Sequence, residues 1–142
     1  MNKLTNEQTL SVLLYAGAGY FLGVSIVHML GLKIPGLFVY FNVPSYAYQD
    51  RIISFLAFGW SAFFYLAGKR LNADLIKMIL LIGLVALIVL YTNTFITDFK
   101  QLDNSIERNA FIWIISSLFF YWLSLVIFSQ KIQTVKARET TN

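Results

Sequence analysis

Five ionisable side chains could form a polar site in this otherwise apolar chain: His28, Asp50, Arg51, Glu107 and Arg108. Together they would offer carboxylates, a neutral base and guanidinium groups. That combination suits binding of an anion or a lipid headgroup, or acid–base chemistry. The alternative is structural, because charges commonly flank membrane helices and Glu107 could serve in helix capping.

The only histidine is His28, and the chain has no cysteine. An ionisable side chain within a membrane helix indicates a functional site by default, here a proton-handling group or a ligand donor. The simpler interpretation is a neutral imidazole that makes one hydrogen bond between helices, or a side chain that extends outward to the membrane surface. Because one histidine without cysteines cannot supply the usual zinc ligand sets, we predict no metal site, and we predict no cofactor.

Asp50 and Arg51 precede an apolar run of the sequence. Adjacent residues on a helix do not face each other, so these two side chains must find separate partners. We expect both at the membrane–water boundary, on the same side of the membrane as His28, where convergence would create the site.

The elements that carry these residues are predicted to be membrane helices. The 142 residues are 58% hydrophobic and 13% charged, whereas soluble domains average about 25% charged residues. Apolar segments of this length cross a hydrocarbon core of roughly 30 Å. We predict helices over residues 10–32, 45–68, 74–97 and 105–129, with a polar, basic tail over residues 130–142. The expected fold is all-α: one domain over residues 1–142, an integral membrane protein built as an up-and-down bundle of four transmembrane helices.

Several polar residues mark where these helices should begin. Ser45 and Asn72 are predicted N-caps, and Asn104 with Glu107 three residues later is a variant capping box. Residues 33–44 contain helix breakers and should form an apolar linker that lies along the membrane interface or tucks against the bundle.

The distribution of charge predicts the orientation. With four spans, both termini and the middle loop share one side, which holds seven basic and three acidic residues and thus the whole net charge of +4. The other side holds four of each. The positive-inside rule then places both termini in the cytoplasm, in the cell (plasma or inner) membrane. We therefore predict the lipid bilayer, and not nucleic acid, as the partner of the basic residues.

Small residues predict where helices approach closely. Gly19 and Gly23 lie one turn apart, and Ser54, Ala57 and Ser61 share one helix face. We favour packing within the chain; the alternative is a homo-oligomer through the Gly19/Gly23 face, or another membrane protein as partner.

Seven aromatic residues lie in the cytoplasmic halves of two predicted helices: Phe63, Phe64, Tyr65, Phe119, Phe120, Tyr121 and Trp122. They could line a site for a lipid, quinone or pigment. Aromatic residues that face lipid are more common in membrane helices.

The sequence contains no phosphate-binding loop or nucleophile motif. We therefore favour a non-enzymatic membrane protein, either an accessory or assembly subunit or one that binds a small lipid or quinone-like ligand. The alternative is a small membrane enzyme or transporter with a polar site at the outer mouth of the bundle, built on His28, Asp50 and Arg51. A channel is disfavoured because residues 78–90 carry no polar stripe.

Overall fold

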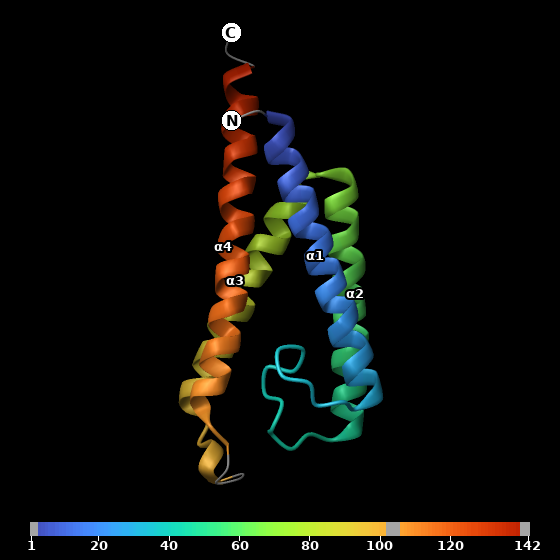
Figure 1. Ribbon diagram of the computed structural model, residues 1–142, viewed down its shortest axis with the longest axis vertical. Helices are drawn as coiled ribbons and strands as arrows, with labels where there is room; N and C mark the ends of the chain where they lie inside the picture. Colours follow the sequence, from blue (N-terminus) through green and yellow to red (C-terminus); the bar gives the residue numbers. More distant parts are fainter. Residues whose placement is uncertain (1–2, 102–105, 140–142) are drawn as a thin grey trace.

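The computed structural model describes residues 3–101 and 106–139 and is entirely helical there apart from its connections (Figure 1). Its elements are α1 (Lys3–Leu30), α2 (Ala47–Arg70), α3 (Ala73–Ile96), the short 3₁₀ helix η1 (Phe99–Gln101) and α4 (Arg108–Glu139). All four α-helices are long and apolar enough to cross a membrane. The start of α1 and the end of α4 lie at the same end of the molecule.

The helices form two hairpins that spread apart along the molecule (Figure 1). The α1/α2 hairpin packs tightly along its length, whereas α2 and α3, although consecutive, make few contacts. The hairpins meet near the chain termini, which we call the closed end. At the opposite end, the loop end, the connection over residues 31–46 lies between them.

The closed end is held together by apolar side chains from all four helices. The buried members of this core are Leu10, Leu14, Ala18, Phe64, Ala67, Ile76, Ile79, Leu125 and Ile132. Small residues let α1 and α2 approach here, and Ser61 donates a hydrogen bond to the Ala18 carbonyl across them at 2.8 Å. Ser54, Ala57 and Ser61 are all buried, which confirms that they share one packed face.

At the loop end, loop 31–46 lies as a wedge between the hairpins. Phe99, Phe111 and Ile115 form part of a second buried cluster, against which Tyr40 and neighbouring loop residues pack. The Tyr40 hydroxyl donates to the Leu90 carbonyl at 3.0 Å, and on the other side the Tyr20 hydroxyl donates to the Gly36 carbonyl at 2.8 Å. The loop is thereby tied to both hairpins.

Two helices extend further than the sequence pattern predicted. Helix α1 begins at Lys3 instead of residue 10, and α4 continues to Glu139, so much of the predicted tail 130–142 is helical. Polarity marks the edge of a membrane but does not end a helix; glycine and proline do so, and neither occurs in these segments. The predicted start of the fourth helix at residue 105, with its cap Asn104, lies outside the described residues.

The predicted cap of α3 is confirmed, whereas that of α2 is wrong. Asn72 Oδ1 accepts hydrogen bonds from the backbone N–H groups of Asp74 and Leu75 at 2.9 and 3.0 Å. Helix α2 is capped one residue later than predicted, at Tyr46, whose N–H donates to the Gln49 side chain at 3.2 Å. The side chain of Ser45 is instead engaged by a carboxylate of the polar site described below.

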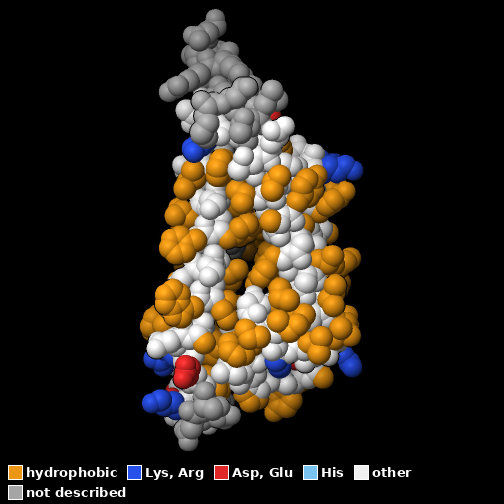
Figure 2. Space-filling view, in the orientation of Figure 1, with side chains coloured by type: hydrophobic (Ala, Val, Ile, Leu, Met, Phe, Trp, Pro, Cys, Tyr) orange, Lys and Arg blue, Asp and Glu red, His pale blue; other side chains and the backbone are white. Residues whose placement is uncertain are grey.

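Apolar side chains cover the middle of the outer surface, and charged side chains gather at its two ends (Figure 2). Large hydrophobic residues such as Phe55, Phe120 and Trp113 are exposed there. Exposed apolar surface of this extent suits contact with lipid, because a soluble protein rarely presents large contiguous apolar patches. By length and composition, the four helices of the described chain are those expected of a small membrane protein.

Candidate functional site

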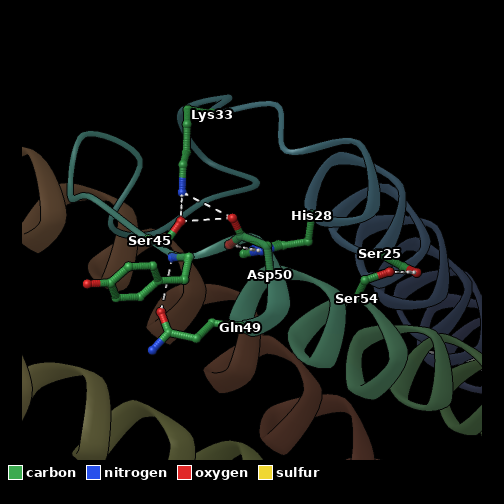
Figure 3. Close-up of polar contacts among 8 residues, drawn as sticks. Ser25, His28, Lys33, Ser45, Gln49, Asp50 and Ser54 are labelled. Atoms are coloured by element: carbon green, nitrogen blue, oxygen red, sulfur yellow. Dashed lines mark hydrogen bonds and ion pairs between the residues drawn. The ribbon is translucent and has the colours of Figure 1, made fainter.

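A buried carboxylate organises the polar groups at the loop end (Figure 3). Asp50 Oδ1 lies 3.2 Å from His28 Nδ1. Its Oδ2 accepts a hydrogen bond from Ser45 Oγ at 2.8 Å and lies 3.6 Å from Lys33 Nζ. The Lys33 ammonium also donates to the Ser45 hydroxyl, which closes the network.

The local sequence brings these four residues together. His28 lies in the last turn of α1, which ends at Leu30. The next residue, Gly31, has a φ of +67°, the left-handed conformation typical of the position after a helix C-terminus. The chain can then turn back, so that Lys33 approaches the start of α2. Asp50 lies in the first turn of α2, where the helix dipole favours a negative charge.

Phe38 covers the polar network from loop 31–46. Its ring stacks on the His28 imidazole, with centroids 3.5 Å apart and planes inclined by 24°, and Lys33 Nζ lies 4.3 Å from the same ring centroid. His28 and Asp50 are only 7% and 5% exposed. A buried charge requires a partner, and here Lys33 supplies the cation that balances the Asp50 carboxylate.

An elongated cavity of about 890 Å³ extends from this network between the two hairpins. The hollow opens on the face shown in Figure 2. Its walls are mostly apolar, and the polar residues His28, Lys33, Ser45 and Asp50 line it at the loop end. The volume lies in the range of small-molecule sites, which combine apolar walls with a few polar groups.

Aromatic side chains form much of the wall nearer the closed end. Of the seven aromatic residues predicted from the sequence, Phe64, Tyr121 and Trp122 line the cavity, whereas Tyr65 and Phe120 are exposed on the outer surface. The ring positions are fixed by hydrogen bonds: the Tyr121 hydroxyl donates to the Leu13 carbonyl and Trp122 Nε1 to the Leu80 carbonyl, both at 2.8 Å.

The structure joins two of the five predicted site residues and leaves the other three apart. His28 and Asp50 contact each other directly. Arg51 is exposed and makes no hydrogen bond or ion pair within residues 3–101 and 106–139, because it points away from the helix face that carries Asp50. Glu107 is exposed, and Arg108 donates to the Thr97 carbonyl at the end of α3 at 3.4 Å.

Lys33, Ser45 and Phe38 were not among the predicted site residues. A signal for the first two existed: each lies five residues from a predicted site residue, and both flank the same short linker. Since the linker joins antiparallel helices, its two ends must lie near each other. Nothing in the sequence distinguished Phe38 from the other aromatic residues of the linker.

In the part of the chain that the structure describes, no three His, Cys, Asp or Glu side chains are grouped closely enough to hold a metal ion. The polar groups that the site does present are a neutral base or donor, a carboxylate, a hydroxyl and an ammonium, next to an apolar cavity. No protein-family model, curated protein or solved structure matches this chain.

Proposed function

We propose that this protein binds a small amphipathic molecule of the membrane, a lipid or quinone-like compound, in the cavity between its two hairpins. The observation that carries the proposal is an apolar cavity of about 890 Å³ with polar side chains at one end. An apolar ligand chain would replace the cavity's contact with lipid or solvent, and the polar head would meet the network around Asp50.

The polar residues at the loop end can stay buried in an apolar protein because the Asp50 carboxylate is paired. Each Asp50 oxygen has a partner, and the ammonium of Lys33 balances the carboxylate. A buried carboxylate whose two oxygens are paired is held rigidly, whereas an isolated buried charge would be expensive. Such a rigid polar end can orient one head group without rearranging.

Cavity blocking tests the proposal. Ala86 lines the cavity, whereas the neighbouring Val85 does not and is 51% exposed. The wild-type protein and the variants Ala86→Trp and Val85→Trp are purified in lipid nanodiscs, and bound small molecules are extracted and identified by mass spectrometry. We expect one amphiphile to be enriched over the nanodisc lipids in the wild type and in Val85→Trp, and to be lost in Ala86→Trp. Equal recovery from all three proteins, or no enrichment in any, would contradict the proposal.

We further propose that both termini are cytoplasmic, in the cell (plasma or inner) membrane. The basic excess at the closed end and the balanced charges at the loop end support this orientation. The polar network would then lie near the outer surface. A cysteine placed after residue 139 should be protected from a membrane-impermeant thiol reagent in intact cells; labelling without permeabilisation would reverse the orientation.

The enzyme or transporter hypothesis has one supporting observation, the buried contact between His28 and Asp50. Paired groups of this kind transfer protons in membrane proteins. Arg51 adds nothing to it, since its side chain is exposed. This hypothesis expects Asp50→Asn to leave expression intact while abolishing a cellular phenotype that the ligand-retention assay does not explain. An accessory role remains a further proposal, tested by whether the protein co-purifies with another membrane protein.

A further inference from the structure

The proton on His28 has a defined position. An ionised carboxylate can only accept hydrogen bonds, so in the contact with Asp50 Oδ1 it is His28 Nδ1 that donates. Lys33 already balances the carboxylate, so a second proton on the ring would leave an uncompensated positive charge in apolar surroundings. The ring is then neutral, and its other nitrogen, Nε2, is a hydrogen-bond acceptor.

This acceptor is available to a ligand. Among the described residues, Nε2 has no hydrogen-bond partner, although His28 is 93% buried by its relative exposure of 7%. His28 lines the cavity. The atom keeps some accessible surface, since it is not one of the fully buried side-chain atoms that lack a partner in the described chain, so a molecule in the cavity that donates a hydrogen bond can reach it.

The charge at this end of the cavity disfavours an anionic head. Lys33 and Asp50 cancel each other, and the remaining nearby cation, Arg51, has an exposed side chain that does not line the cavity. A phosphate or carboxylate would meet the Asp50 carboxylate without a free cation to offset the repulsion.

The cavity volume sets the scale of the ligand. At about 890 Å³ it lies in the range of small-molecule sites and can take one apolar chain with a compact head.

We infer that the ligand is an uncharged, single-chain amphiphile whose hydroxyl group donates a hydrogen bond to His28 Nε2. This inference depends on the proposed ligand-binding function and specifies its chemistry. A long-chain isoprenoid alcohol and a prenylated hydroquinone share this chemistry.

Matched pairs of probes test the hydroxyl. Binding to the wild-type protein in nanodiscs is measured for farnesol and its methyl ether, and for a prenylated hydroquinone and its dimethyl ether. Each ether keeps the chain and the oxygen but loses the donor. We expect each hydroxyl probe to bind about tenfold more tightly than its ether, the effect of one hydrogen bond in a poorly solvated site. The hydroxyl probe that binds more tightly, farnesol or the hydroquinone, identifies the preferred head group. Binding of oleate, a single-chain anion, is measured in the same way to test the anionic alternative.

Asp50→Asn should abolish this preference without removing the cavity. In the wild type, Ser45 donates to the Asp50 Oδ2 atom and Lys33 lies beside it, so in the variant the amide oxygen stays with these two donors and the amide NH₂ faces His28 Nδ1. The ring proton then moves to Nε2, which can bond to an alcohol or an ether oxygen equally well. The hydroxyl-to-ether ratio should fall to about one. Arg51→Gln, one residue away and exposed, should retain the wild-type ratio.

Because the chain has a single histidine, nitrogen NMR of histidine-labelled protein reports the same exchange directly. The wild type should carry its proton on Nδ1 and Asp50→Asn on Nε2. Failure of all probes to bind contradicts the proposed function itself. Binding with a wild-type ratio near one, tighter binding of oleate, or a wild-type proton on Nε2 contradicts this inference and leaves ligand binding standing.

Discussion

At the closed end, all four helices meet in one apolar core, whereas at the loop end residues 31–46 hold the hairpins apart and carry a polar network. The closed end contains Leu14, which is fully buried; the loop end contains His28 and Asp50, buried beside a cavity. The stabilising core and the polar end of the cavity therefore lie at opposite ends of the long axis, although core residues such as Phe64 also line the cavity. Substitutions of core residues outside the cavity lining, such as Leu14, should change unfolding, and substitutions in the polar network should change binding.

The largest expected effect on stability is at the centre of the closed-end core. Leu14→Ala removes a side chain that is 0% exposed and leaves a cavity among all four helices. We expect the free energy of unfolding to fall by about 2–5 kcal/mol. Unfolding in increasing fractions of a denaturing detergent, followed by circular dichroism, measures this change.

A matched control for Leu14→Ala is available on the same helix. Val12 is 65% exposed and faces outward, so Val12→Ala should change the unfolding free energy by less than about 0.5 kcal/mol. Equal destabilisation by the two variants would mean that the closed end is not the stabilising core.

The next effect concerns the closest approach between the helices. A Cβ atom at Gly17 would lie 2.3 Å from the Tyr121 hydroxyl and 2.5 Å from Phe64 Cδ1. Gly17→Ala must therefore displace two packed rings, and overpacking of this kind costs about 1–3 kcal/mol. At Gly19, two residues along, nothing lies within 4 Å of the added atom. Gly19→Ala should therefore be neutral or stabilise by up to about 1 kcal/mol, because alanine favours the helix. If both variants unfold alike, the close contact of α1 with α2 and α4 is wrong.

The comparison of Gly17 with Gly19 also shows how much of the helix packing could be predicted from the sequence. Gly19 and Gly23 attracted notice because their spacing matches a known helix-packing pattern, yet Gly19 is open to the outside and Gly17 makes the close contact. Small residues indicate that two helices approach closely, but they do not identify which helix packs against them. Association of two chains through Gly19 and Gly23 stays a prediction.

The candidate site was also only partly predictable from the sequence. Membrane helices make any ionisable residue within them conspicuous, and that principle led to His28 and Asp50. It could not separate Asp50 from Arg51, because adjacent positions look alike until the helix rotation is known. Lys33 and Phe38 depend on the path of a loop with no periodic pattern, and only the folded chain fixes where they lie.

A smaller effect is expected where a side chain links α1 and α2. Ser61→Ala removes the hydrogen bond to the Ala18 carbonyl and should cost about 0.6 kcal/mol, the average for such bonds between membrane helices. Ser124, which is half-buried and within the described residues bonds only to the Phe120 carbonyl of its own helix, provides the control. Ser124→Ala should leave the unfolding curve unchanged, and a larger loss there than at Ser61 would contradict the assignment.

A similarly small change in overall stability, with its main effect confined to the loop end, is expected for Tyr40→Phe. This variant keeps the ring packed against Phe111 but removes the hydroxyl that donates to the Leu90 carbonyl and lies 3.2 Å from Thr94 Oγ1. Thr94 retains its own hydrogen bond to Leu90, so the helix is undisturbed. We expect the unfolding free energy to change by less than about 1 kcal/mol.

The local consequence of Tyr40→Phe should be larger than the global one. With one tether to α3 removed, the amides of loop 31–46 should exchange with deuterium faster, while those of the closed-end core keep the wild-type rate. The control is Tyr46→Phe, since Tyr46 is 70% exposed and its hydroxyl makes no hydrogen bond to another element in the described chain. If the loop opens the cavity, ligand release should also accelerate in Tyr40→Phe and not in Tyr46→Phe. Faster exchange in both halves of the molecule would instead show that the two ends are not independent.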